Sequence, residues 1–71
     1  MTIPFTVRLG RQLCHFRELR GLTQIQLADL AGIRQSHLSQ IENGVVAVRV
    51  DTLYALAQTM ELKMEEVFHG M

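Results

Sequence analysis

The sequence predicts an all-α fold: one compact domain of five helices over residues 1–71, with a helix-turn-helix unit at about residues 24–43. Apolar residues recur at helical spacing, and glycines follow several of these segments where a helix has to end. In the middle of the chain, two short periodic segments are joined through Gly32, the pattern of two helices that cross at a steep angle. A chain of this size buries one small core, so a single domain is expected.

The first helix is expected at residues 6–20, and Gly21 supplies its stop. Its main stripe consists of Leu9, Leu13, Phe16 and Arg20. The next two helices, residues 24–30 and 35–42, make the helix-turn-helix. Thr23 and Gln26 form a capping box at the start of this unit. Gly32 can take the positive φ of the turn, and the inner faces hold Leu27, Ala31, Leu38 and Ile41.

The last two helices are expected at residues 51–59 and 64–68, with Gly70 just beyond. The fourth helix has an inner face made of Leu53, Leu56, Ala57 and Met60. The run from Val45 to Val50, before the fourth helix, is rich in β-branched residues, which favour extended backbone.

Four segments within residues 9–68 resemble the Xre/Cro-cI-type family of helix-turn-helix transcriptional regulators: FRELRGLTQ, LADLAGI, HLSQIENG and DTLYALAQ. The resemblance implies a lambda-repressor-like DNA-binding domain whose third helix enters the major groove of double-stranded DNA. It implies no cofactor.

The third helix carries polar side chains where the resemblance implies base contacts. These candidates are Gln35, Ser36, His37 and Gln40. Glutamine can bond adenine through N6 and N7, serine can donate or accept, and histidine can donate to guanine. The candidate phosphate contacts are Gln24, Arg34, Ser39, Asn43 and Arg49. The alternative is that all of these are ordinary polar residues of helix caps and solvated faces.

The resemblance also implies a half-buried ion pair between Arg17 and Glu42, with a structural role. The sequence departs from the family at several helix ends. Arg34, Arg49 and Lys63 stand where serine or threonine usually caps a helix, and Glu61 stands where glycine often ends the fourth helix. Each lost cap lowers the stability of the domain by about 0.5–2 kcal/mol. This loss suggests either that a partner stabilises the domain or that the arginines contact phosphate instead of capping.

The formal net charge of zero is unevenly divided along the chain. Residues 1–49 contain six arginines against three acidic residues, whereas residues 50–71 contain one lysine against four. This asymmetry is compatible with one face meeting phosphate. No catalytic arrangement and no paired histidine or cysteine spacing for a metal is visible, so an enzyme is not expected. Cys14 is interpreted as a packed side chain, and the absence of a leader or long apolar run predicts a cytoplasmic protein without a membrane segment.

The valine-rich loop is the least family-like segment, because relatives usually carry lysine, arginine and proline there. One side of an extended loop can pack on the fourth helix while the other stays in water, and exposed apolar clusters often mark a contact site. The plain alternative is a slightly apolar loop without a partner. The expected dimer or partner interface comprises Val45, Val48, Val67 and Phe68.

These features predict a sequence-specific DNA-binding regulator, a repressor, that binds a palindromic operator as a homodimer. One alternative is an antitoxin that binds a small toxin protein and its own promoter. Another is an interaction or coactivator module that does not read bases. The polar set on the third helix argues against the last alternative, and nothing in the sequence separates the first two.

Overall fold

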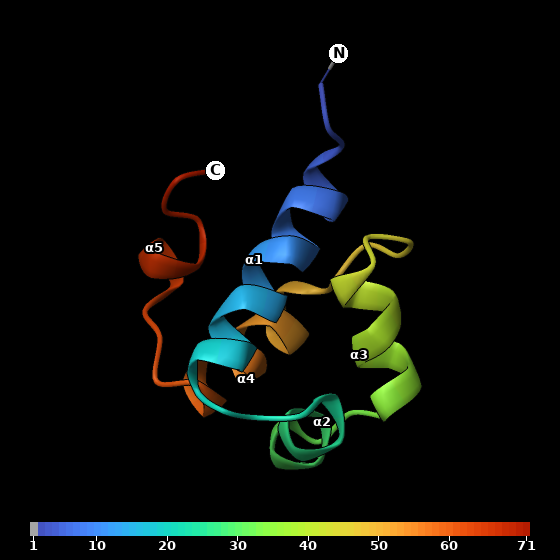
Figure 1. The fold of residues 1–71 in the computed structure, drawn as a ribbon, viewed down its shortest axis with the longest axis vertical. Helices are drawn as coiled ribbons and strands as arrows, with labels where there is room; N and C mark the ends of the chain where they lie inside the picture. Colours follow the sequence, from blue (N-terminus) through green and yellow to red (C-terminus); the bar gives the residue numbers. More distant parts are fainter. Residues whose placement is uncertain (1) are drawn as a thin grey trace.

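The computed structural model describes residues 2–71 (Figure 1). The described residues form five helices and no strand: α1 (Phe5–Leu19), α2 (Gln24–Ala31), α3 (Gln35–Glu42), α4 (Val50–Thr59) and α5 (Met64–Val67). The predicted all-α fold of five helices is therefore confirmed. The bounds of α3 agree with the prediction, and those of the other helices differ by one residue at one or both ends.

α1 runs through the middle of the molecule, with α3 on one side and α5 on the other (Figure 1). α1 packs on α3 and α5, and α2 packs on α3 and α4. The core consists of apolar side chains from all five helices and the short segment before α5. Its largest fully buried members are Leu13, Leu27, Leu38, Ile41, Leu56, Met60 and Val67. Within residues 2–71, none of the helices has the length and apolarity that crossing a membrane requires.

Two residues expected on inner stripes, Phe16 and Ala31, are only partly buried and pack on the edge of the core. Arg20, expected on the stripe of α1, is exposed. Its Nε atom donates to the carbonyl oxygen of Met60 at 2.9 Å. Arg20 therefore stabilises the end of α4 by satisfying a carbonyl that the helix itself leaves unpaired.

Both ends of α2 follow the predicted chemistry. The Thr23 hydroxyl accepts from the Gln26 N–H at 3.1 Å, and the Gln26 side chain accepts from the Thr23 N–H at 2.9 Å. Gly32 ends α2 with φ 75°. The N–H of Ile33 then reaches back to the carbonyl of Ala28 at 2.9 Å. Both the capping box and the glycine turn are confirmed. The capping box fixes the start of α2, and the glycine turn sets the direction in which the chain leaves α2 toward α3.

Gly10 allows α1 to lie directly against the end of α3. It is buried, and a Cβ atom at this position would lie 2.4 Å from the carbonyl oxygen of Ile41 and 2.5 Å from that of Glu42. Both neighbouring atoms belong to the backbone, so neither can move without moving the helix. The contact between these two helices thus depends on the absence of a side chain at Gly10.

The starts of α3 and α4 lack side-chain caps, as the sequence indicated. The side chains of Arg34 and Arg49 make no capping hydrogen bond to α3 or α4. At α5, the Glu66 carboxylate accepts from the backbone N–H of Lys63 at 2.9 Å, and lysine itself has no atom that could accept in return. The first N–H groups of α3 therefore remain available to an external acceptor.

α4 ends at Glu61, which has a left-handed φ of 58°. The N–H of Leu62 bonds the carbonyl of Ala57 at 2.8 Å and the N–H of Glu61 bonds that of Gln58 at 3.0 Å, the pattern of a Schellman turn. A residue with a side chain loses about 1–2 kcal/mol of folding free energy by adopting this conformation. Glycine avoids this strain, but part of the gain is offset because glycine loses more conformational freedom on folding.

We expect Glu61→Gly to raise the free energy of unfolding by about 1 kcal/mol and the melting temperature by roughly 4–8 °C, because glycine removes this strain. Thermal unfolding followed by circular dichroism checks the shift. Glu61→Ala is the matched control, since it removes the carboxylate and keeps the strain, and it should melt close to the parent protein. An equal rise in both variants would assign the effect to charge instead of backbone.

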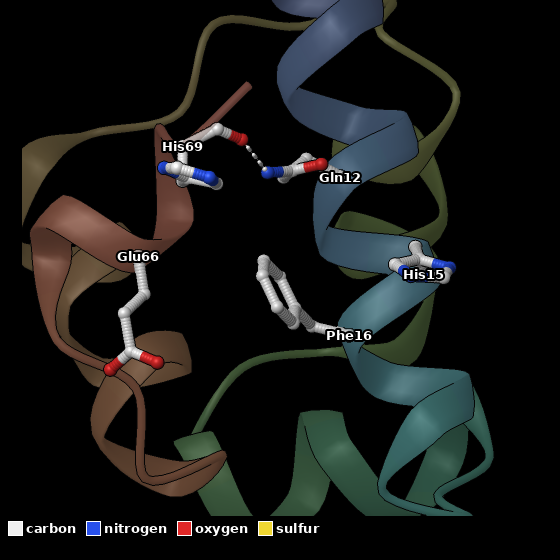
Figure 2. A pocket seen from close by; sticks show the side chains of 5 residues that line it. All are labelled: Gln12, His15, Phe16, Glu66 and His69. Atoms are coloured by element: carbon white, nitrogen blue, oxygen red, sulfur yellow. Dashed lines mark hydrogen bonds between the residues drawn. The ribbon is translucent and has the colours of Figure 1, made fainter. Parts of the chain in front are cut away.

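The segment after α5 is tied to α1. The Gln12 amide donates to the carbonyl oxygen of His69 at 2.7 Å (Figure 2), and the Arg8 guanidinium donates to the carbonyl of Met71. A hollow of about 340 Å³ lies between α1 and α5, and Phe16 points into it (Figure 2). Because α5 and α3 flank opposite sides of α1, this hollow is separate from the face that α3 presents.

Candidate nucleic-acid interface

α3 buries one side and exposes polar groups on the other. Leu38 and Ile41 are fully or almost fully buried and attach the helix to the core. Among the expected base contacts, Gln35, Ser36 and Gln40 are exposed, while His37 is half-buried. The helix therefore presents a polar, accessible surface, strongest in its first turn, on a rigid support.

A hydrogen-bonded network joins the first residue of α3 to the first residue of α2. The Gln35 Nε2 atom donates to Gln24 Oε1 at 2.8 Å. The Gln24 Nε2 atom in turn donates to Glu42 Oε1 at 2.9 Å. Gln24 thus keeps one N–H for an external acceptor, because an amide nitrogen carries two and only one is used here.

The ion pair expected between Arg17 and Glu42 is present, and it anchors this network. Arg17 Nε donates to Glu42 Oε2 at 2.7 Å and Arg17 Nη2 donates to Glu42 Oε1 at 3.1 Å, a bidentate arrangement. The two side chains are 11% and 3% exposed. The hydrogen bond to Glu42 raises the pKa of Arg17 above its usual value, so the guanidinium stays charged.

Arg17 makes two further contacts: its Nη1 atom donates to the carbonyl of Leu22 at 2.8 Å, and its Nη2 atom lies 3.5 Å from the Cys14 sulfur. Burial, followed by the nearby charge of Glu42, raises the pKa of the Cys14 thiol. The thiol is therefore predominantly protonated at neutral pH, in agreement with its interpretation as a packed side chain.

The expected phosphate contacts lie around the exposed part of α3. Arg34 is exposed at the start of the helix and, within residues 2–71, takes part in no ion pair or side-chain hydrogen bond. Asn43 is exposed at the end of the helix, and its amide lies 3.5 Å from the hydroxyl of the half-buried Ser39. Arg49 lies 3.4 Å from Asp51, with both side chains largely in solvent. Such an exposed pair is weak, so Arg49 can exchange its partner readily.

Comparison with known proteins decides the family. The family model described as Helix-turn-helix matches residues 15–67, which include α2, α3 and the whole of α4. The chain belongs to the Xre/Cro-cI-type helix-turn-helix family. The members of this family are DNA-binding transcriptional regulators.

Individual relatives agree with this assignment. The chain is 34% identical over 59 residues to the HTH-type transcriptional regulator PuuR of Escherichia coli, covering 83% of this chain and 32% of PuuR. It is 49% identical over 43 residues to a candidate antitoxin, HigA2, of Mycobacterium tuberculosis, covering 59% of this chain and 43% of HigA2. The chain thus spans about a third of the length of PuuR and less than half of HigA2.

Among solved structures, the helix-turn-helix domain is similar to the restriction-modification controller protein C.AhdI from Aeromonas hydrophila. The two share a TM-score of 0.86 and 30% sequence identity, over 89% of this chain and 96% of the controller. The similarity therefore extends over nearly the whole of both chains.

The residues expected at a partner interface do not all lie on the surface of this helix-turn-helix domain. Val45 is 68% exposed and Phe68 is 39% exposed, and Val48 is partly buried against the core. Val67 is fully buried, so its assignment to an interface is wrong. The single turn of α5 directs this side chain into the core, where no partner can reach it.

The structure shows a groove that is lined in part by Val48 and Phe68, two of the expected interface residues, and by Phe5, which the sequence analysis did not name. It has a volume of about 210 Å³ and lies where the start of α1, the loop before α4 and the end of α5 meet. Phe5 and Phe68 stack across part of it with ring centroids 6.2 Å apart, and Val50 on its rim is 77% exposed. Phe5 and Phe68 are more than 60 positions apart, so no local pattern indicated that Phe5 joins this surface.

Proposed function

We propose that this domain belongs to a repressor that binds a palindromic operator as a homodimer and reads bases with α3. The observation that carries the proposal is the first turn of α3, where an accessible Gln35 is held by the hydrogen bond that it donates to Gln24 of α2, while Leu38 and Ile41 anchor α3 in the core. A base reader has to combine this accessibility with a defined orientation.

In this proposal the base contacts are Gln35, Ser36, His37 and Gln40, and the phosphate contacts are Gln24, Arg34, Ser39, Asn43 and Arg49. Phosphate contacts fix the position of the helix and supply salt-dependent affinity, whereas base contacts supply discrimination. Arg34 supports the division because its charge has no partner among residues 2–71 and stands beside the first turn of α3.

The test begins by selecting bound DNA from a random pool. We expect Gln35→Ala to cost about 1–3 kcal/mol of binding on the selected site and to relax preference at one or two base pairs. Arg34→Ala, the matched control, should weaken selected and random DNA alike and lower the salt slope by about 0.9. Equal losses on both DNAs for both variants would show that α3 does not read bases.

The homodimer is supported by the apolar groove and by the size of the domain. A single helix-turn-helix covers one half-site, which is too little for operator-level specificity. A second copy seated on the Phe5–Phe68 groove would bury the exposed apolar side chains on its rim, and the two recognition helices of a palindrome-binding dimer lie about 34–36 Å apart.

Phe68→Lys is expected to shift the protein toward monomer in analytical ultracentrifugation and to reduce operator binding, because it puts a charge at the groove. Leu19→Lys is the control, since Leu19 is 62% exposed at the opposite end of α1 from Phe5. Hydroxyl-radical footprinting should show two half-sites with dyad symmetry. A dimer that persists in Phe68→Lys would place the interface elsewhere.

The second candidate function is an antitoxin, favoured by the 49% identity to the candidate antitoxin HigA2 over 43 residues. An antitoxin of this fold would bind a toxin protein as well as its own promoter. Native purification followed by mass spectrometry separates the two: a small protein in stoichiometric amount supports the antitoxin, and its absence supports the plain repressor.

A further inference from the structure

Four side chains form a continuous hydrogen-bonded relay from α1 to the exposed first turn of α3. Arg17 donates twice to Glu42, at 2.7 and 3.1 Å. Gln24 donates to Glu42 at 2.9 Å, and Gln35 donates to Gln24 at 2.8 Å. The inner end of this relay is buried, since the Glu42 side chain is 3% exposed, and the outer end is an exposed glutamine.

The direction of every bond in the relay follows from Glu42. An ionised carboxylate can only accept, so Gln24 has to turn its Nε2 atom toward Glu42. The Oε1 atom of Gln24 then faces α3, and Gln35 has to turn its own Nε2 atom toward it. One N–H and the Oε1 atom of Gln35 remain for an external partner, as one donor beside one acceptor.

We propose that Glu42 is a specificity-determining positioning residue that sets the donor–acceptor pattern Gln35 presents to DNA. The proposal rests on the base-reading function argued above. Adenine offers the acceptor N7 beside the N6 donor in the major groove, which matches one donor and one acceptor. Guanine offers two acceptors, N7 and O6, which match two donors. Glu42 therefore selects adenine over guanine without touching the DNA.

Glu42→Gln inverts the relay while keeping its shape. The oxygen of the new amide goes to Arg17 Nε, which makes the shorter of the two bonds from the guanidinium, 2.7 against 3.1 Å. Arg17 Nη2 loses its acceptor on residue 42 and keeps its contact with the Cys14 sulfur. The new Nε2 atom then faces Gln24, which has to turn over to accept from it. Gln35 has to turn over in response, and both of its N–H groups become available to DNA.

The experiment selects DNA from a random pool with the parent protein, Glu42→Gln and Gln35→Ala, at a temperature where circular dichroism shows each to be folded. We expect Glu42→Gln to lower the ratio of binding to adenine over guanine roughly tenfold at the base pair that Gln35→Ala relaxes, with other positions unchanged. Leu53→Ala, which removes a core side chain in α4, lowers stability without touching the relay and should keep the adenine preference.

Gln24→Ala provides a second variant that spares the ion pair, should Glu42→Gln not fold. It removes the middle of the relay, so Gln35 can turn freely and its adenine preference should fall, whereas Arg34→Ala should keep it. Suppose that Gln35→Ala relaxes the preference at one base pair, so that base reading holds. An unchanged adenine preference at that base pair in Glu42→Gln would then overturn the relay. If only Gln24→Ala folds, an unchanged adenine preference in that variant would overturn it. Unchanged preference at every base in Gln35→Ala would overturn base reading and the relay together.

Discussion

Replacement of Glu42 by alanine is expected to destabilise the domain by about 3–5 kcal/mol, because it leaves a buried charge without its partner. Arg17 is 11% exposed and directs its Nε and Nη2 atoms at the carboxylate, so few water molecules can replace the lost oxygens. The amide of Gln24 loses its acceptor in the same variant. For a chain of this size the loss corresponds to a fall in melting temperature of roughly 15 °C or more.

Asp51→Ala is the matched control for this prediction. Asp51 also faces an arginine, at 3.4 Å, but the two side chains are 82% and 73% exposed. Exposed pairs contribute about 0–1 kcal/mol, so this variant should melt within a few degrees of the parent protein. Thermal and urea unfolding measure both variants. Similar melting temperatures for Glu42→Ala and the parent protein would show that the buried pair contributes little to folding.

The parts of the fold that depend on neighbouring residues could be predicted from the sequence. Thr23 and Gln26 form a capping box within a single helical turn. Gly32 adopts a left-handed backbone conformation that other residues adopt with difficulty. Both signals lie within ten positions of each other and remain valid whatever packs on them. The helix-turn-helix and the bounds of α3 were predictable for this reason.

The relay was predictable only in pieces. Gln24, Gln35 and Glu42 could each be singled out, but their mutual bonds depend on how α2 and α3 cross. A sequence pattern gives the face on which a side chain lies and does not give the rotamers that connect two faces. The role of Glu42 beyond its ion pair therefore required the structure.

Val67 shows a different limit. It lies in a helix of four residues, which is too short to display any apolar period, so the sequence could not distinguish its inner from its outer side. Its neighbour Phe68 was assigned to the surface by the same reasoning, and this residue is exposed. Short elements of this kind are oriented by the core they meet.

Gly10 is an isolated glycine inside a helical pattern. A glycine in such a position that does not end a helix often indicates that another part of the chain packs closely against it. The pattern alone does not name the surface that approaches. In the structure this surface is the last turn of α3, whose carbonyl oxygens would lie 2.4 and 2.5 Å from a Cβ atom on Gly10. These carbonyls belong to the helix that carries the candidate base contacts.

Gly10→Ala is accordingly expected to destabilise the domain by about 3 kcal/mol or more, although alanine is the better helix former by about 1 kcal/mol. The added methyl group can be accommodated only if α1 and α3 separate, because its nearest neighbours are backbone atoms of Ile41 and Glu42. The separation would also move α3 relative to the first residue of α2. We therefore expect weaker DNA binding as well as a melting temperature lower by roughly 12 °C or more.

Gly21→Ala separates this packing effect from the general cost of replacing a glycine. Gly21 has φ 70° and open space around it, so alanine there meets backbone strain of about 1–2 kcal/mol and no clash. Thermal unfolding should place Gly21→Ala between the parent protein and Gly10→Ala, with DNA binding retained at temperatures where it is folded. If Gly10→Ala instead melted at or above the parent protein, α1 and α3 would not be in the close contact that positions the helix carrying the candidate base contacts.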